Sequence, residues 1–569
     1  MEIRKLTVKN FRGIKELEWN LPNERVFCLI GKGDSAKSTI LDAIKYIFYP
    51  NWNLSLSDSD FYKCDTDNPI TIEVNFGALT EEFCSLSKYG YYLRGWDCSS
   101  LKLFDEPDEH LEKVLTARLT VEKDLEPKWT IVCDRKPDGV DFRTTDRTKV
   151  SVGVVGAYTE KQLSWANGTA LAKLTNSKNL NESLVNASRT ARSSLDDDRD
   201  VTLIDFDEAA KKSEIVAKQL GVPVQGEYKA QLDLNSINIK IGVLALHDDE
   251  MPLKQLGLGS RRMLLCGIQK LGLEEGHITL IDEMEYGLEP HRIARLLKHI
   301  KEDKLGQYFL TTHSPVVLRE LTINDLYIIH NNNGDIQIIT ANNEEFNEYG
   351  VQGKIRSSAE AFLAKKVIVC EGATEVGFLR GFDDYQLGKG LDPLSYHGIA
   401  LLDAHGASKI KSLAKAFKSL EYSVAIIADG DAPKQFSEVD EQELILSGME
   451  VEVWEDNLSL EERAMMDLPW DYVIASVKLA EEFGFAVCET VSSVYGSKVD
   501  NNIDSWEESD SLRVSIGKSA KSKKTGWFKD ITRGDQWFKR IDLAFEDDEF
   551  KKTDLYLKLN KLWGWIEGV

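Results

Sequence analysis

The sequence lacks several features that would each indicate a particular class of protein. Its eight cysteines include no CxxC pair, which argues against a disulfide framework or a zinc site and suits a reducing cytosol. The N-terminal segment has no apolar core of signal-peptide length, and no run reaches the ~18 apolar residues that a membrane helix needs. The formal net charge of -24 argues against a simple coat for nucleic acid or an anionic membrane, although a local basic groove remains compatible with it. We therefore expect a soluble cytoplasmic protein without membrane association.

The length and the patterning predict several α/β domains. A chain of 569 residues is long enough for two to four domains, because one core rarely extends beyond ~250–300 residues. Apolar strands alternate with helices in residues 1–157 and 223–345, whereas the composition of residues 158–222 predicts a helical insertion. The pattern loosens at residues 346–364, where we expect a linker. A second α/β domain with a mostly parallel sheet and a basic, helical C-terminal extension is predicted for residues 365–569.

A phosphate loop, residues 31–38, follows an early apolar strand and precedes a predicted helix. It reads GKGDSAKS, which matches GxxxxGK[ST] except that Ala36 replaces the second glycine. Backbone N–H groups of such a loop surround phosphates, while Lys37 would reach the terminal phosphates and Ser38 would bind Mg²⁺. We expect alanine to be tolerated if φ at this position is negative. The predicted ATP-binding residues of this segment are Gly31, Gly33, Asp34, Ser35, Ala36, Lys37, Ser38 and Thr39.

Two carboxylates end a later apolar strand. Asp282 and Glu283 follow the segment HITLI; Asp282 would hold Mg²⁺ with the nucleotide, and Glu283 would polarise the attacking water as a catalytic residue. An apolar strand that ends in DE is weak evidence alone, but it follows the phosphate loop in the correct order. His313, at the end of the next predicted strand, is a candidate sensor of the γ-phosphate.

Between these motifs, the turn LGLGSRR leads into a helix, and Gly259 and Ser260 are predicted to form a second anion site. In this order the motifs resemble those of ABC-type ATPases, and the opening LTVKNFRGIKELEW is similar to the RecF and SMC branch. In that family the signature of one subunit closes on the nucleotide of another, so the resemblance implies a homodimer or higher oligomer. The turn departs from the usual LSGGQ-like signature, which indicates slow, regulatory ATP turnover.

Acidic residues follow two strands of the second predicted domain. The segment KKVIVC is followed by Glu371 and Glu375, and SVAIIA by Asp429 and Asp431. Functional residues of parallel sheets gather at the carboxyl ends of the strands, so we expect these four side chains to meet. Four close carboxylates repel one another unless cations are bound. Mg²⁺ or Mn²⁺ would relieve this repulsion, and would activate water or stabilise the leaving oxygen of a phosphodiester.

The acidic pattern resembles a Rossmann-like Toprim domain. An ABC-type ATPase followed by a Toprim domain is similar to the overcoming lysogenization defect (OLD) family of nucleases, which includes the GajA subunit of the Gabija anti-phage system. The resemblance implies ATP and Mg²⁺ (or Mn²⁺) as cofactors and dimerisation through the helical insertion. It implies metal-binding or general-base roles for Glu371 and Glu375, and metal ligation by Asp429 and Asp431.

OLD-type Toprim domains add a later acid and a lysine. The candidates for the acid are Glu455, Asp456, Glu461 and Glu462. The basic segment 517–529 contains the candidate lysines, of which we name Lys524 and Lys529 as catalytic. Its cations, beside Trp527 and Phe528, suit contact with a phosphate backbone, and a solvated loop is the alternative interpretation.

The sequence predicts an ATP-binding, divalent-metal-dependent endonuclease that cuts or nicks DNA under nucleotide control, in anti-phage defence or DNA processing. A helicase-like or other defence protein is a candidate partner. One alternative is a non-nucleolytic repair ATPase of the RecF and SMC type, against which the intact acidic set argues. Another is an immune effector that cuts cellular RNA such as tRNA. Whether ATP activates or inhibits cleavage stays open.

Overall fold

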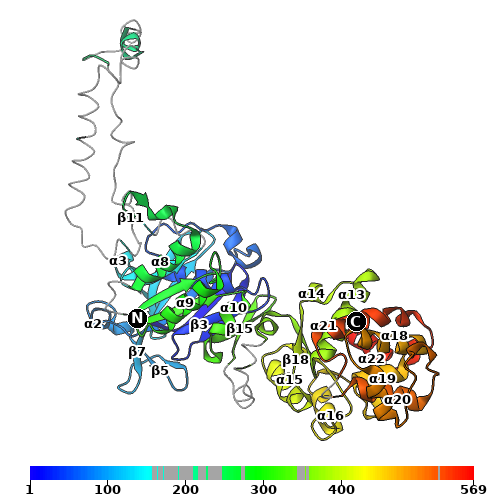
Figure 1. Cartoon of the computed structure of the whole chain (residues 1–569). Coiled ribbons are helices and arrows are strands. Elements are labelled where there is room, and N and C mark those ends of the chain that lie inside the picture. Colours follow the sequence, from blue (N-terminus) through cyan, green and yellow to red (C-terminus); the bar gives the residue numbers. More distant parts are fainter. Residues whose placement is uncertain are drawn as a thin grey trace. The chain divides into compact units, whose positions relative to one another are not determined.

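The computed structural model describes residues 1–156, 209–215, 226–228, 246–270, 276–341, 358–522 and 526–568, with the single residues 163, 171, 190 and 353. The chain forms two compact units (Figure 1): Met1–Arg12, Glu16–Val26 and Ser38–Leu310 in one, and Gly13–Lys15, Phe27–Lys37 and Thr311–Val569 in the other. Most of the predicted insertion at 158–222 and of the predicted linker at 346–364 lies outside the described residues. Of the helices described, none is long and apolar enough to span a membrane.

An antiparallel sheet accounts for much of the first unit. β1 (Glu2–Phe11) pairs with β4 (Ile70–Gly77), which pairs with β7 (Glu112–Val121), which pairs with β8 (Pro127–Cys133). Alternating apolar residues in β1 place Leu6 and its neighbours in the core. The other described strands of this sheet region are β2 (Ile14–Asn20), β5 (Arg94–Asp97), β6 (Lys102–Phe104) and β9 (Lys136–Asp141). β11 (His247–Asp248) and β12 (Met251–Pro252) form a separate two-stranded sheet.

Parallel strands follow in the same unit. β10 (Val152–Val155) pairs with β13 (His277–Ile281), and β13 pairs with β14 (Gly306–Thr311). Every residue of β13 and β14 is buried, as expected for strands covered on both faces. The helices of this half of the chain are α1 (Lys37–Ile47), α2 (Glu81–Cys84), α3 (Thr144–Arg147), α8 (Leu258–Lys270) and α9 (Pro290–Lys301).

The second unit contains the strand that precedes the phosphate loop. β3 (Val26–Ile30) is wholly buried and pairs in parallel with β15 (Leu326–Asn332), which pairs in antiparallel with β16 (Asp335–Thr340). The short helix α10 (Pro315–Glu320) is capped by Ser314, whose hydroxyl accepts a hydrogen bond from a backbone N–H.

A separate parallel sheet lies in the C-terminal part of the second unit, in the order β18-β17-β19-β20. Its strands are β17 (Lys366–Cys370), β18 (Ile399–Asp403), β19 (Ser423–Ala428) and β20 (Glu450–Val453). Helices α13 (Ala373–Gly388), α15 (Ile410–Ser419) and α16 (Glu438–Leu446) connect them. This succession confirms the predicted alternation of strands and helices. Because β17 and β19 are parallel neighbours, residues that follow them lie at one edge of the sheet.

Helices complete the C-terminal part, and α21 packs along α13 (Figure 1). Glycines permit this close approach, because a Cβ at Gly377 of α13 would meet the carbonyl oxygen of Ile531 at 2.2 Å. Segment 517–529 does not begin as a loop, since residues up to Ala520 belong to a helix that packs against α17. These helices are α14 (Leu394–His397), α17 (Leu460–Asp467), α18 (Trp470–Glu482), α19 (Val487–Tyr495), α20 (Asp510–Ala520), α21 (Ile531–Ile541) and α22 (Asp554–Glu567).

Candidate active site and nucleotide site

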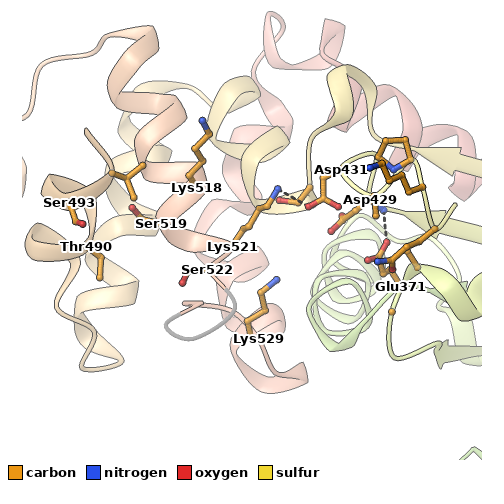
Figure 2. Close-up of a pocket in the computed structure, with 18 residues that line it drawn as sticks. Glu371, Asp429, Asp431, Thr490, Ser493, Lys518, Ser519, Lys521, Ser522 and Lys529 are labelled. Atoms are coloured by element: carbon orange, nitrogen blue, oxygen red, sulfur yellow. Dashed lines mark hydrogen bonds and ion pairs between the residues drawn. The ribbon is translucent and has the colours of Figure 1, made fainter. Parts of the chain in front are cut away.

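The carboxyl ends of β17 and β19 bring three carboxylates together. Glu371 follows β17, and Asp429 and Asp431 follow β19. One carboxylate oxygen from each residue lies within 4.8 Å of the other two, and Figure 2 shows the three side chains grouped on one side of a cavity. The residue between the two aspartates is Gly430, where a Cβ would meet the carbonyl oxygen of Trp454 at 2.3 Å. Tight packing of the turn therefore requires this glycine.

Backbone amides hold the acidic side chains in place. The N–H of Asp429 donates to Glu371 Oε2 at 3.1 Å, and the N–H of Leu460 donates to Asp429 Oδ1 at 2.8 Å. Glu375 lies in the first turn of α13, where its Oε2 accepts a hydrogen bond of 2.8 Å from the N–H of Gly372. Its side chain is only 4% exposed. The fourth predicted carboxylate is therefore a buried neighbour of the other three.

Burial and mutual repulsion raise the pKa values of these acids. Burial, followed by repulsion from Glu461 and Glu371, raises the pKa of Glu375 to about 8. Burial and the charges of the same neighbours raise the pKa of Asp429 well above its ordinary value, and burial also raises the pKa of Glu371. A divalent cation would offset this cost, and a donor set of carboxylate oxygens fits Mg²⁺ or Mn²⁺. The residues present thus fit the predicted metal.

Two lysines neutralise part of the acidic cluster. Lys521 Nζ lies 2.6 Å from Asp431 Oδ2 and 2.6 Å from Glu462 Oε2. Lys529 Nζ lies 2.9 Å from Oε1 of Glu461, a side chain that is fully buried. Burial alone would lower the pKa of both lysines, but the neighbouring carboxylates raise it. Both ammonium groups therefore stay charged beside the acids.

The acids and lysines line a cavity of about 1330 Å³. Small-molecule pockets typically measure ~300–1,000 Å³, so this cavity can admit part of a larger molecule. Figure 2 shows Lys518 and Lys521 on and after α20, between the carboxylates and the residues Thr490 and Ser493 of α19. One wall is therefore acidic, and the opposite wall carries lysines and hydroxyl groups.

The other late acids lie outside the cluster. Glu455 and Asp456 pair with Lys558 and Arg463, at 3.9 and 3.1 Å respectively. Of the predicted catalytic lysines, Lys529 lies in the cluster, whereas Lys524 is outside the described residues. Lys521, which the sequence interpretation did not single out, contacts two of the acids, and its only signal was membership of the basic segment.

Trp527 and Phe528, beside the cations of the basic segment, belong to the core. Both side chains are fully buried, and the ring of Phe528 stacks on Trp537 with centroids 4.3 Å apart. These rings are part of the core of the helical region. They fix the segment that carries Lys529, and they offer no surface on which a base could stack.

The phosphate loop begins at Gly31, whose φ is +151. A Cβ at this position would meet the carbonyl oxygen of Ile329 at 2.6 Å, so the loop requires glycine here. Lys37 is buried, and its ammonium donates to the carbonyl oxygens of Gly31 at 3.0 Å and Lys32 at 2.8 Å. It also contacts Ser35 Oγ at 3.1 Å. The ammonium group of Lys37 is thus held by the loop residues that precede it in the sequence.

Ala36 does not meet the condition under which alanine suits this loop. Its φ is +70, in the left-handed region, so the negative φ under which we expect alanine to be tolerated is not present. Asp34 also has a positive φ, of 58, whereas no atom would obstruct a Cβ at Gly33. A left-handed conformation costs an alanine roughly 1–2 kcal/mol. The loop therefore keeps a conformation that favours glycine at a position where glycine is absent.

Ser38 links the phosphate loop to the later acidic motif, because its Oγ donates to Asp282 Oδ1 at 3.0 Å. These two groups are the predicted Mg²⁺ ligands of the nucleotide site. Arg262 of α8, which the sequence interpretation passed over, is fully buried. Its Nη2 donates to the carbonyl oxygens of Asp282 at 2.7 Å and Glu283 at 2.9 Å. Arg262 thereby fixes the backbone that carries both carboxylates.

The signature turn forms the start of α8. A Cβ at Gly259 would meet the carbonyl oxygen of Gly287 at 2.2 Å, so this glycine permits close packing. The hydroxyl of Ser260 accepts a hydrogen bond of 3.0 Å from Arg292 Nη1. His313 is exposed two residues after β14.

Family models match most of the chain. Residues 1–133 match an AAA ATPase domain, and residues 101–319 match an AAA domain described as a putative AbiEii toxin of a type IV toxin–antitoxin system. Residues 362–431 match the Toprim domain of proteins similar to the overcoming lysogenization defect protein. The last match includes Glu371, Glu375, Asp429 and Asp431. A comparison with curated proteins gives no match.

Two solved structures show a distant similarity. One is an Smc head bound to the C-winged helix domain of ScpA, with 15% identity and a TM-score of 0.32, covering 60% of this chain and 98% of that chain. The other is an Smc head with an extended coiled coil bound to the C-terminal domain of ScpA from Pyrococcus furiosus, with 12% identity and a TM-score of 0.33, covering 62% and 99%. Similarity at this level carries no functional argument, and the assignment depends on the family models. The chain joins an ATPase domain of the P-loop type to an OLD-type Toprim domain in an α/β architecture, and these domain matches together support an ATPase-nuclease of the OLD type.

Proposed function

We propose that the chain is a divalent-metal-dependent endonuclease that cuts or nicks DNA under nucleotide control, in anti-phage defence or DNA processing. The observation that carries the proposal is the meeting of Glu371, Asp429 and Asp431 within 4.8 Å in a cavity that also contains lysines. A protein that only bound nucleic acid would gain nothing from an acidic cluster that repels phosphates. Carboxylates gathered around a cation are instead suited to phosphodiester hydrolysis.

Each acidic residue has a proposed part in the reaction. Glu371, Asp429 and Asp431 would hold Mg²⁺ or Mn²⁺, which lowers the pKa of bound water and stabilises charge on oxygen when present. Backbone amides orient Glu371 and Asp429, so their oxygens need little reorganisation. Glu375, with a pKa of about 8, can hold or release a proton near neutral pH. Lys529 would supply positive charge beside the developing oxyanion.

The nucleotide site would control when cleavage occurs. We propose that ATP binds the phosphate loop with Mg²⁺ at Ser38 and Asp282, and that Glu283 orients the attacking water while His313 contacts the γ-phosphate. Gly259 and Ser260 would close on the nucleotide of a second copy, which makes the active form a homodimer or a higher oligomer. Cleavage measured with ATP, with ADP and without nucleotide gives the direction of control.

Supercoiled plasmid tests the proposal directly. Asp429→Ala and Glu371→Ala should abolish nicking in Mg²⁺ or Mn²⁺ while ATP binding persists, and EDTA should stop cleavage by the unsubstituted chain. Glu455→Ala is the matched control, because that acid is 70% exposed and lies outside the cluster. Unaffected nicking by Asp429→Ala and Glu371→Ala would contradict the assignment of these residues to the nuclease site. Cleavage of tRNA but not plasmid would favour an RNA nuclease, and no cleavage of either would favour a repair ATPase.

Other sequence expectations stay predictions. They are the domain limits at residues 157, 222, 345 and 364, dimerisation through the insertion, a helicase-like partner, and the narrower resemblance to GajA. Partial proteolysis followed by mass spectrometry would locate the limits.

A further inference from the structure

Four lysines of the described residues line the cavity, and they differ in their ionic partners. Lys521 and Lys529 are paired with the acids of the cluster. Lys434 and Lys518 line the same cavity and are exposed. Within the described part of the chain, neither of these two has an ion pair, so water is the partner that a ligand would need to replace.

The two exposed lysines come from different segments that line the cavity. Lys434 is three residues beyond Asp431, in the segment that follows β19. Lys518 is three residues before Lys521 and on the same face of α20, about one helical turn farther from the acids. Figure 2 shows Lys518 between Lys521 and the α19 hydroxyl of Ser493. Two separate segments of the chain therefore bring an exposed cation to the cavity that holds the carboxylates.

The charge of the cavity differs from that of the chain. Among the described residues, the charged side chains that line it are three carboxylates and four lysines, although the chain as a whole carries a net charge of -24. A bound divalent cation would add further positive charge. The excess would suit a polyanion, since duplex DNA carries one negative charge per ~1.7 Å of its axis. A mononucleotide bound at the carboxylates would have no further backbone phosphate for Lys434 or Lys518 to contact.

We propose that Lys434 and Lys518 bind backbone phosphates on opposite sides of the phosphodiester held at the carboxylates. The substrate is then an extended DNA strand that continues through the cavity in both directions, past Ser493 on the α20 side. This inference rests on the proposed nuclease function, which it deepens by naming the residues that hold the substrate.

The test measures how binding depends on salt. The full chain, in a chelator that prevents cleavage, is titrated against a fluorescein-labelled DNA duplex between 50 and 200 mM KCl. Each phosphate contact adds about 0.9 to the log–log slope, so Lys434→Ala or Lys518→Ala should reduce the salt-induced loss of affinity by about 3.5-fold. Lys552→Ala is the control, because its side chain is 69% exposed and does not line the cavity. Its slope should match that of the unsubstituted chain.

The outcomes separate this inference from the proposed function. Unchanged slopes in both cavity variants would overturn the inference, even if the unsubstituted chain nicks plasmid. Reduced slopes without any nicking in Mg²⁺ or Mn²⁺ would support DNA binding by Lys434 and Lys518 and would overturn the proposed nuclease function. A larger effect on an RNA duplex than on DNA would overturn the choice of DNA. Glutamine replaces alanine at either position if thermal unfolding shows that the alanine variant is misfolded.

Discussion

Replacing Glu375 with glutamine should remove a pH-dependent loss of stability. The folded pKa of about 8 lies above the ordinary value of 4.5, so between these values the folded chain holds a proton that the unfolded chain has released. Stability from this group is therefore present at low pH and is lost as pH rises toward 8. Integrating the linkage from pH 6 to 8 gives a loss of about 2 kcal/mol. Glutamine keeps an acceptor for the N–H of Gly372 and cannot ionise.

Urea unfolding of the full chain in a chelator at pH 6, 7 and 8 measures this effect. The unsubstituted chain should lose stability across the series, and Glu375→Gln should lose about 2 kcal/mol less. Glu455→Gln, which changes an exposed acid, should behave like the unsubstituted chain. Added Mg²⁺ should stabilise the unsubstituted chain more at pH 8 than at pH 6, because a cation favours ionised ligands. An equal loss of stability in Glu375→Gln and the unsubstituted chain would refute the assignment of the proton to this cluster.

Three further substitutions, two of them paired with a comparison substitution, test separate features of the structure. Ala36→Gly should leave the free energy of unfolding unchanged or raise it by about 1 kcal/mol, because relief of backbone strain outweighs the added entropy of the unfolded chain. Ala43→Gly, inside α1, should instead lower it by about 1 kcal/mol. Equal losses in the two variants, measured by thermal unfolding, would contradict the inference that Ala36 is strained. Arg262→Ala should slow ATP hydrolysis about tenfold without weakening ATP binding, as measured by phosphate release and nucleotide titration, since two hydrogen bonds to the acidic turn are lost. Lys529→Met should cost about 3 kcal/mol in urea unfolding because it leaves buried Glu461 unpaired, and Glu461→Gln should cost clearly less; equal costs would argue against the pair.

The sequence was most informative where local pattern and topology act together. Glu371 and Asp429 each follow a short apolar strand, and parallel neighbours place such residues at one edge. The pairing of Ser38 with Asp282 follows from the same rule in the first half of the chain, where a loop after one strand meets an acid after another. Strand order itself was not needed for these predictions. It was enough that the residues end strands of one parallel sheet.

Side-chain partners that depend on tertiary packing could not be predicted in the same way. A segment with many lysines does not reveal that Lys521 reaches Asp431, because the rotation of α20 against α17 decides it. Trp527 and Phe528 are fully buried, with Phe528 stacked on Trp537 of α21, and this burial has no local signature in the sequence. The positive φ of Ala36 is likewise imposed by the loop, against the preference of the residue.

The net negative charge of the chain is compatible with DNA binding at Lys434 and Lys518, because salt sets the distance over which charges act. At 0.15 M ionic strength the Debye length is about 8 Å, so a phosphate in the cavity responds to the nearby lysines and not to the net charge of -24. At 0.01 M the Debye length is about 30 Å, and the whole acidic surface then repels the approaching duplex. Salt should therefore have two opposed effects: it weakens the contacts of Lys434 and Lys518, and it screens the long-range repulsion. Affinity for DNA should pass through a maximum at moderate salt, and an affinity that rises steadily down to 0.01 M would mean that the acidic surface does not face the bound duplex.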